Sequence, residues 1–383
     1  MKCTELLEKI DSLSDSYIPI WIEACEIESP TSHKTGVDAT GRYFAAIAER
    51  HGWDVEYFHQ DKSGDVVTIT MNPEAEGAPI FLSGHMDTVH AVGQFGYPAV
   101  RRDETKLYGP GVTDCKGGIV AALLAMDALA AVGYDRRPVK LILQSDEECG
   151  SKLSNKATIN YICKSAEGAA AFLNLEGHAR GYACLIRKGA VTFTFNVHGV
   201  PAHAAACATA GANAIAEAAY KIIEMEKLKD SAGITCNCGT IVGGTVANTV
   251  PDSCTFTANI RFANSEQLKI AREYAGRVAA EVHIPGSSCD LVMPEGRVAM
   301  EYTERNFDLL TKMNEIYAEN GLPILEVGKR VGASDAADIT AHGIACIDSI
   351  GVTGGKIHSL DEYAEICSLN EAAKRIGAVV YSL

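Results

Sequence analysis

The sequence predicts an α/β protein with a catalytic domain and a smaller, inserted, ferredoxin-like α+β domain. Strand-like apolar segments in the first half of the chain each end in polar residues that carry chemistry. A different pattern, strand-helix-strand-strand-helix-strand, fills the stretch from about 188 to 298. The 383 residues also exceed the roughly 250–300 that usually share one hydrophobic core, so two domains are expected.

Hydrophobic periodicity defines the inserted domain. Apolar residues alternate strictly in the first expected strand, and a period near 3.6 marks two helices. The expected elements, in order, are a strand at 191–197, a helix at 212–227, strands at 239–242 and 255–262, a helix at 266–282 and a strand at 289–292. Because the candidate catalytic residues lie outside this stretch, we expect residues 1–187 and 299–383 to form the catalytic domain around an insertion of residues 188–298.

Three strand-like segments lead directly into His, Asp or Glu residues. Residues 80–82 run into His85 and Asp87, residues 139–143 run into Glu147 and Glu148, and residues 170–175 run into Glu176. In α/β sheets, ligands bind in the crevice beyond the carboxyl ends of the strands. These side chains are therefore expected to meet at one edge of a sheet.

Asp114 occupies a different kind of position. It follows a loop rich in Gly and Pro at 109–111 and precedes an apolar helical stretch from Gly117 to Ala131. The N-terminus of a helix favours an anionic side chain or ligand. Asp114 is therefore a candidate for the same site.

The residue types point to a two-metal hydrolase. Imidazole nitrogen and carboxylate oxygen suit zinc, and a bridging carboxylate can hold two ions about 3.5–4 Å apart. Asp87, two residues after His85, can accept the second ring N–H of that histidine and set its tautomer. Glu147 and Glu148 cannot both point the same way in an extended chain, so one can bind metal while the other acts as a general base.

Five blocks resemble one known family. They are His85 to Val89, Gly109 to Gly118, Ser145 to Ser151, Val197 to Ala204 and Lys356 to Tyr363, and they span nearly the whole chain. In order and content they are similar to the zinc-dependent family of glutamate carboxypeptidase, aminoacylase, succinyl-diaminopimelate desuccinylase and peptidase T. The resemblance implies a mixed sheet flanked by helices in the catalytic domain, and a lid and dimerisation role for the inserted domain.

The resemblance also implies a role for each site residue. Asp114 bridges two metal ions, which are expected to be zinc, with cobalt or manganese as alternatives. One ion is completed by His85 and Glu176, and the other by Glu148 and His358. Glu147 is the base, and Asp87 supports catalysis. His203 is similar to a family histidine that reaches into the partner's active site and steadies the oxyanion, which implies a homodimer.

The substrate class follows from fewer residues. Family members with Glu at the position of Glu176 tend to be carboxypeptidases, aminoacylases and deacylases, whereas aminopeptidases and dipeptidases tend to have Asp. Asn248 and Arg297 are similar to residues that hold a substrate carboxylate, although Val298 replaces the proline common after this arginine.

The implied reaction is hydrolysis of an amide or peptide bond next to a free carboxylate through a metal-bridging hydroxide. The substrate is then a small peptide or an N-acyl amino acid. Alternatives are a di- or tripeptidase of the same family, or a catalytically inactive dimeric relative that binds metal or peptide. Glu147 and His358 are both present, which favours an enzyme.

Composition excludes several other classes. A net charge of −15 disfavours nucleic-acid binding, which needs a basic face. No apolar stretch of about 18 residues is available to span a membrane. The 13 cysteines include no Cys-x-x-Cys pair, so we expect reduced thiols and a cytoplasmic protein. Gly109 and Gly111 lack the third glycine of a dinucleotide fingerprint.

Two further features receive weaker interpretations. The segment from Gly332 to Ala336 lacks the closing glycine of a serine nucleophile elbow, and in the resemblance it is a loop on the substrate side. The remaining histidines, which have no motif around them, are expected at the surface or behind the ligands. These are His33, His51, His59, His90, His178, His198, His283 and His342.

Overall fold

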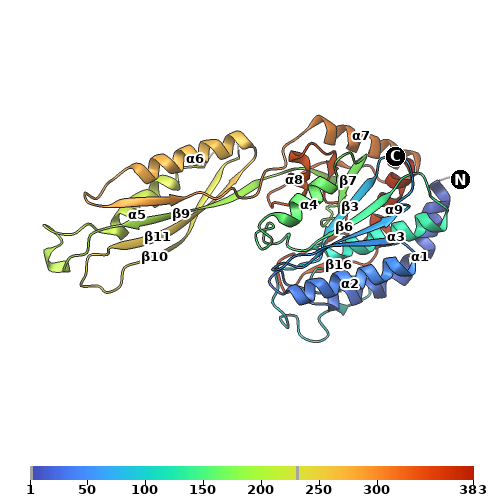
Figure 1. Ribbon diagram of the computed structural model, residues 1–383, viewed down its shortest axis with the longest axis horizontal. Helices are drawn as coiled ribbons and strands as arrows, with labels where there is room; N and C mark the ends of the chain where they lie inside the picture. Colours follow the sequence, from blue (N-terminus) through green and yellow to red (C-terminus); the bar gives the residue numbers. More distant parts are fainter. Residues whose placement is uncertain (1–2, 230–232) are drawn as a thin grey trace. The chain divides into compact units, whose positions relative to one another are not determined.

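The computed structural model describes residues 3–229 and 233–383, which form two compact units (Figure 1). The larger unit consists of Met1–Leu185, Tyr302–Lys329 and Ser334–Leu383. The smaller unit consists of Ile186–Glu301 and Arg330–Ala333. No helix within the described ranges combines the length and the apolar character needed to cross a membrane.

A mixed six-stranded sheet forms the centre of the larger unit, as the fold class predicted. Its strand order is β1-β2-β6-β3-β7-β14, in which β3 runs parallel to β6 and β7 and β2 runs antiparallel to β1 and β6. The strands are β1 (Asp54–Phe58), β2 (Val66–Met71), β3 (Ile80–His85), β6 (Val139–Gln144), β7 (Ala171–Asn174) and β14 (Cys346–Ile347). The parallel strands β3, β6 and β7 therefore end at one edge.

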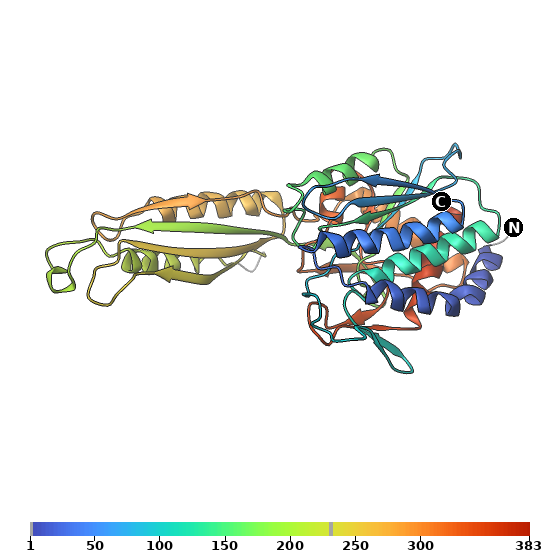
Figure 2. The same cartoon turned by 60° about the horizontal axis from the view of Figure 1, so that its bottom comes forward.

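Helices lie on both faces of this sheet (Figure 2). They are α1 (Cys3–Glu26), α2 (Lys34–Arg50), α3 (Lys116–Ala131), α4 (Ala157–Ser165), α7 (Glu304–Glu319), α8 (Ala336–Ala341) and α9 (Ser368–Ser382). Helix α3 packs between α1, α9 and the sheet and is buried on almost every side. A helix that is apolar all round belongs in a core, which agrees with the apolar stretch of the sequence.

Short strands complete the larger unit. An antiparallel sheet has the order β15-β16-β5-β4. Its strands are β4 (Arg101–Arg102), β5 (Lys106–Tyr108), β15 (Gly354–Gly355) and β16 (Tyr363–Glu365). Pairing of β16 with β5 brings the segment around His358 beside the loop that carries Asp114. A separate pair is formed by β8 (Tyr182–Arg187) and β13 (Glu326–Arg330).

The smaller unit has the predicted β-α-β-β-α-β order. It contains β9 (Gly189–His198), the short helix η1 (Ala204–Ala206), α5 (Ala214–Met225), β10 (Thr235–Gly243), β11 (Ser253–Phe262), α6 (Ser265–Ala280) and β12 (Ser288–Val292). The sheet order β10-β11-β9-β12 is antiparallel throughout, with β10 at one edge.

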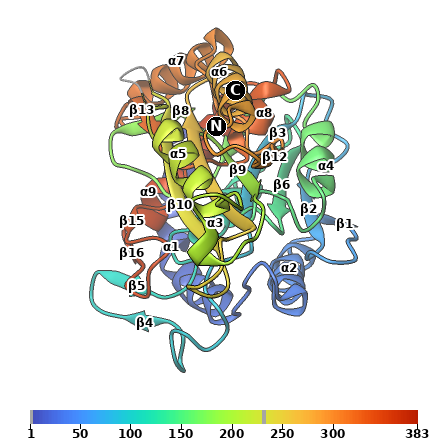
Figure 3. The ribbon, with the colours of Figure 1, turned by 90° about the vertical axis from the view of Figure 1, so that its left-hand side faces the viewer.

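The alternation of buried and exposed side chains along its strands explains how this unit forms its core. On β9, residues at odd positions such as Val191, Phe193 and Phe195 are buried, while the residues between them reach the surface or are half-buried. The buried face packs against Ala and Met side chains of α5 and α6. Figure 3 views this unit from the end at which β9 stops and α5 begins.

Candidate dinuclear metal site

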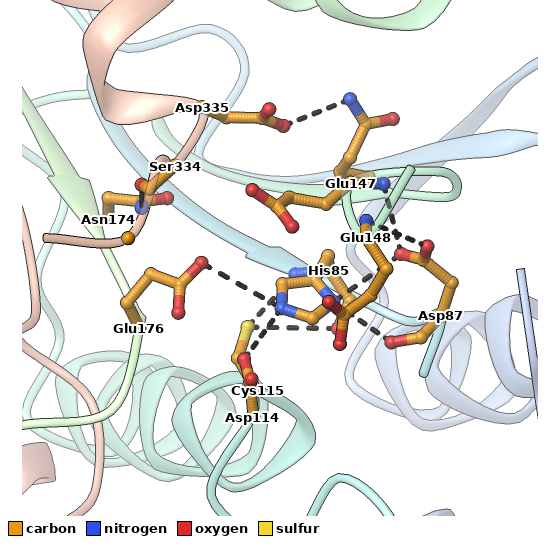
Figure 4. Close-up of polar contacts among 12 residues, drawn as sticks. His85, Asp87, Asp114, Cys115, Glu147, Glu148, Asn174, Glu176, Ser334 and Asp335 are labelled. Atoms are coloured by element: carbon orange, nitrogen blue, oxygen red, sulfur yellow. Dashed lines mark hydrogen bonds and ion pairs between the residues drawn. The ribbon is translucent and has the colours of Figure 1, made fainter. Parts of the chain in front are cut away.

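His85, the last residue of β3, is held in one orientation by Asp87. Its Nδ1 lies 2.9 Å from the carbonyl oxygen of Asp87 and 3.4 Å from Oδ1 of the same residue (Figure 4). Nδ1–H therefore donates to Asp87, so Nε2 faces the site, where it would offer its lone pair to a bound metal. This is the tautomer that a metal-binding histidine needs.

Asp114 lies between two histidines. Its Oδ1 is 3.0 Å from Nε2 of His85, and its Oδ2 is 3.1 Å from Nε2 of His358. Although burial acts in the opposite direction, hydrogen bonds from the two histidines hold the pKa of Asp114 well below its ordinary value. A carboxylate with one oxygen directed at each histidine has the geometry of a bridging ligand.

The other two carboxylates complete two ligand groups. Glu148 Oε2 lies 3.1 Å from Nε2 of His358, and Glu176 Oε1 lies 3.8 Å from Nε2 of His85. Within each group the ligand atoms lie no more than 4.8 Å apart. The groups are His85, Asp114 and Glu176, and Asp114, Glu148 and His358. The fold thus brings all five expected ligands together in the pairing that the resemblance implies.

The donor set fits two divalent cations. Three carboxylates and two imidazoles offer only oxygen and nitrogen, which suits zinc, manganese or cobalt. Burial raises the pKa of Glu148 to about 7; the hydrogen bond from His358 opposes this shift, and the nearby negative charge of Asp114 adds to it. Hydrogen bonds to Asp114 and Glu148 raise the pKa of His358 to about 10. The cluster therefore concentrates negative charge of the kind that divalent cations would neutralise.

Asp87 has a second contact that the sequence did not suggest. Its carboxylate accepts the backbone N–H of Glu147 and of Glu148, each at 3.1 Å, and the hydroxyl of Thr31 at 2.7 Å. One buried carboxylate therefore fixes both the histidine of β3 and the backbone of the loop after β6. Nothing near Thr31 in the sequence could have indicated this contact, because 56 residues separate it from Asp87.

Glu147 and Glu148 point in different directions, as the sequence argument required. In Figure 4 the Glu148 carboxylate turns toward His85 and Asp114, whereas the Glu147 carboxylate turns toward the side where Glu176 and Asp335 lie. Glu147 is buried, with 7% of its surface exposed. The arrangement places Glu148 in a ligand group and leaves Glu147 outside both groups.

Close packing of α3 sets the positions of two loops. A Cβ on Gly117 would lie 2.3 Å from the carbonyl oxygen of Val112, and one on Gly118 would lie 2.1 Å from that of Leu175. Only glycine permits this approach. The two glycines therefore let the start of α3 press against the loops that carry Asp114 and Glu176.

Glu362 joins the two segments that supply Asp114 and His358. Its buried carboxylate accepts backbone N–H groups from Thr113 at 2.9 Å, Asp114 at 3.1 Å and Gly111 at 3.4 Å. Burial raises the pKa of Glu362 to about 8, and the three donors oppose that shift. The last sequence block contained this residue, but its pattern did not reveal the contact.

The segment expected on the substrate side lies at the edge of the site. Ser334 accepts a hydrogen bond at 3.0 Å from Asn174, at the end of β7, and Asp335 accepts one at 3.0 Å from Gln144, at the end of β6 (Figure 4). Both contacts are buried. They hold the start of α8 beside Glu176 and Glu147.

His203, Asn248 and Arg297 lie in the smaller unit, at two different ends of it. His203 is exposed, its Nδ1 accepts the N–H of Ala205, and the adjacent Ala204 donates to the carbonyl of Asn248. His203 follows the end of β9 at His198. Asn248 lies on the loop between β10 and β11, which pairs with His203 through Thr249, whereas Arg297 pairs with Ala190 at the start of β9. Eight residues of strand span about 26 Å. One chain therefore does not bring Asn248 and Arg297 to the same carboxylate.

In this α/β unit, two ligand groups meet at the ends of the strands and share one aspartate. This is the architecture of a metal-dependent hydrolase. Residues 81–382 match the model of "Peptidase family M20/M25/M40". The chain therefore belongs to this family of metallopeptidases and amidohydrolases.

Relatives with assigned activities match most of the chain. Carboxypeptidase G2 from Pseudomonas sp. (strain RS-16) is 28% identical over 352 residues, which cover 90% of this chain and 83% of that protein. Succinyl-diaminopimelate desuccinylase from Ruegeria pomeroyi is 26% identical over 337 residues, 78% of this chain and 82% of that protein.

A solved structure has the same fold. The Bacillus subtilis YXEP protein, described as a dinuclear metal binding peptidase from the M20 family, aligns with a TM-score of 0.70 and 14% identity. The alignment covers 97% of this chain and 99% of that one.

Proposed function

We propose that this enzyme hydrolyses an amide or peptide bond next to a free carboxylate, as a carboxypeptidase or an N-acyl amino acid amidohydrolase. The observation that carries the proposal is the pair of ligand groups sharing Asp114, with Glu147 turned away from its neighbour Glu148. We propose zinc as the metal, held by His85 and Glu176 in one group and by Glu148 and His358 in the other, with Asp114 common to both.

Each protein group has a distinct task in this proposal. When bound, two divalent ions polarise a carbonyl group and lower the pKa of water to about 7. Glu147 accepts a proton from the attacking water and delivers it to the leaving nitrogen. Asp87 keeps His85 in the required tautomer and holds the backbone of Glu147 in place.

The substrate class rests on Glu176 and on the relatives. Glu at this position favours the carboxypeptidase and acylase branch over the aminopeptidase branch. The names of the two relatives, a carboxypeptidase and a desuccinylase, both describe cleavage of an amide bond. Both a peptide cut before its last residue and an N-acyl amino acid present a free carboxylate beside the scissile bond.

A homodimer would supply the carboxylate site from two chains. Arg297 and the pair His203 and Asn248 lie about 26 Å apart along β9, by the rise of about 3.3 Å per residue. If Arg297 comes from one chain and His203 and Asn248 from its partner, all three can serve one substrate. Arg297 would then bind the carboxylate, with His203 at the oxyanion.

The smaller unit has a surface suited to this association. Its edge strand β10 and its helix α5 expose large apolar side chains, which monomeric proteins seldom gather. They are Ile215, Tyr220, Ile223, Ile241 and Val242. We propose that this surface forms the dimer contact and that the smaller unit acts as dimerisation domain and lid.

The proposal is tested with paired substrates. An N-acyl amino acid and the same compound with its carboxylate converted to an amide are assayed with the zinc-loaded protein. Loss of a charged hydrogen-bond partner costs about 1.5–3 kcal/mol, so kcat/KM should be about 10–150-fold higher for the free carboxylate. Arg297→Met should remove most of this preference.

A different outcome would favour another branch. Equal rates for the two compounds, together with a requirement for a free amino group in di- or tripeptides, would assign the protein to the peptidase T side of the resemblance. Binding of metal and peptide without turnover of any amide would instead indicate an inactive relative.

A further inference from the structure

A second cavity lies in the larger unit, and its lining includes none of the five expected metal ligands. Its volume is about 300 Å³, at the lower end of the range for small-molecule sites. Three segments line it: residues 178–181 between β7 and β8, residues 322–325 after α7, and residues 370–375 in the first half of α9. The cavity is large enough to be a ligand site of its own.

Arg375, on α9, lines this cavity and is a buried cation without a carboxylate beside it. Only 7% of its surface is exposed. Nη2 donates to the carbonyl of Gly351 at 3.0 Å, and this is the one hydrogen bond of the side chain within residues 3–229 and 233–383. Arginine carries five N–H donors and is almost never buried unless it is paired. An anion in the cavity would supply the partner that the described chain does not.

Part of the Arg375 guanidinium remains available to such a ligand. Nε is fully buried and has no partner in the described residues, so no ligand reaches it. Nη1 also makes no hydrogen bond with these residues, but it retains accessible surface. Because Arg375 lines the cavity, Nη1 is the group that a bound anion can contact, while the bond from Nη2 to Gly351 holds the guanidinium in place.

The other charged residues of the lining each have an opposite charge nearby. Arg180 lies 3.4 Å from Glu371, and Lys374 lies 2.7 Å from Asp11. Burial lowers the pKa of Arg375, and the charge of Glu371 compensates only in part. Arg375 is therefore the lining residue whose charge is left for a ligand to balance.

Another part of the lining is apolar and held in a fixed position. The loop after α7 contributes Leu322, Pro323 and Leu325. Asn314 accepts the N–H of Leu325 at 2.9 Å and donates to its carbonyl at 2.8 Å. Small-molecule sites combine such preformed apolar walls with a few polar groups that orient the ligand. This wall suits the hydrocarbon part of a small molecule.

The cavity adjoins the metal site without being part of it. Gly351, whose carbonyl accepts from Arg375, donates its own N–H to the carbonyl of Glu176 at 3.0 Å. On the neighbouring segment, His178 is held by a contact of 2.9 Å between its Nδ1 and the carbonyl of Ser349. The cavity therefore lies behind the first ligand group, and its own polar group is Arg375.

We propose that this cavity binds a small organic carboxylate with a short apolar group. The carboxylate pairs with Arg375 through charge-assisted hydrogen bonds, and the apolar group contacts Leu322, Pro323 and Leu325. The proposal concerns binding alone and does not depend on the reaction proposed above.

The test uses benzoate as the probe and benzamide, which has the same shape without the charge, as its control. Hydrogen exchange is measured in the zinc-loaded protein at residues 178–181 and 322–325. Benzoate should slow exchange in both segments, because a ligand that binds the folded state suppresses local opening. Benzamide at the same concentration should have little effect.

Three variants assign this protection to Arg375. Arg375→Met removes the charge and should raise the benzoate concentration for half-maximal protection about 10–150-fold, the value of one charged hydrogen bond. Arg42→Met makes the same change at an exposed arginine of α2 and should leave that concentration unchanged. Leu322→Trp fills the cavity, keeps Arg375 and should abolish protection, so it decides the question if Arg375→Met does not fold.

Three results would overturn the site. They are equal protection by benzamide, protection by benzoate only in the loop around residues 145–148 at the metal site, and an unchanged benzoate concentration in folded Arg375→Met and Leu322→Trp. Because exchange is measured without turnover, these results decide the site even if the protein hydrolyses no amide.

Discussion

Glu147 carries the proton transfer in this mechanism, and its replacement should separate chemistry from metal binding. Glu147→Gln keeps the shape of the side chain but cannot accept a proton. Because general-base catalysis contributes about 10²–10⁴-fold, kcat should fall by that factor. Bound metal per chain and the melting temperature should match those of the wild type and of the exposed control Glu104→Gln. A metal-loaded variant with more than a tenth of the wild-type rate would remove Glu147 from the mechanism.

Glu362 should act on metal affinity without touching metal. Glu362→Gln replaces one acceptor oxygen by an amide group, so the side chain can no longer accept from Thr113 and Asp114 at one oxygen and from Gly111 at the other. Residues that orient metal ligands typically change metal affinity 10–100-fold, and we expect a loss in that range for zinc measured by competition with a chelator. Unchanged zinc affinity in a folded variant would show that the loop of Asp114 is held by other contacts.

Residues that follow regular strands could be placed from the sequence, and their distant partners could not. His85, Glu148 and Glu176 each follow an apolar segment, and parallel strands end at one edge, so their meeting was predictable. The contacts of Thr31 and Glu362 join segments far apart in the chain.

At the scale of helices and strands, a buried ion pair holds the two helices of the smaller unit together. Lys221 on α5 lies 2.9 Å from Glu217 and donates to the carbonyls of Val278, Ala279 and Glu281 at the end of α6. Both charged side chains are almost fully buried. The pair therefore caps α6 and fixes α5 against it.

Breaking this pair should destabilise the smaller unit. Lys221→Met leaves Glu217 buried without its cation, which costs about 3–5 kcal/mol. Chemical denaturation should show this loss, and hydrogen exchange should quicken in α6. The double variant Glu217→Gln with Lys221→Met should recover part of the stability, because no buried charge remains. A loss below about 1 kcal/mol in the single variant would mean that apolar packing alone holds α5 and α6.

Periodicity predicted the elements of the smaller unit well and the shortest strands of the larger unit not at all. The six elements of the smaller unit and helix α3 are long enough to show a period of 2 or 3.6, and they were found within a few residues of their bounds, apart from the start of β10. Strands β4, β5, β15 and β16 have only two or three residues and lack a detectable period. They nevertheless bring the segment of His358 to Asp114.

For the molecule as a whole, the proposed dimer predicts complementation between inactive chains. Glu147→Ala and His203→Ala are each expected to be inactive alone. After subunit exchange, one site of a heterodimer has an intact Glu147 from its own chain and an intact His203 from the partner. Activity should return, up to about half of the wild-type rate per heterodimer if the sites are independent.

Subunit exchange must be measured separately, for example by mass spectrometry of differently labelled chains. Recovery would support both the dimer and the action of His203 across it. Confirmed exchange without recovery would mean that His203 acts within its own chain or has no catalytic role.

The central claim is that the protein is a hydrolase with two metal ions around Asp114. The most direct test is to titrate zinc into chelator-treated protein. Bound metal and the rate of hydrolysis of an N-acyl amino acid are measured at each step. The account predicts almost no activity without metal and full activity as binding approaches two ions per chain, with Asp114→Asn unable to reach that stoichiometry. Full activity with one ion or none bound would contradict it.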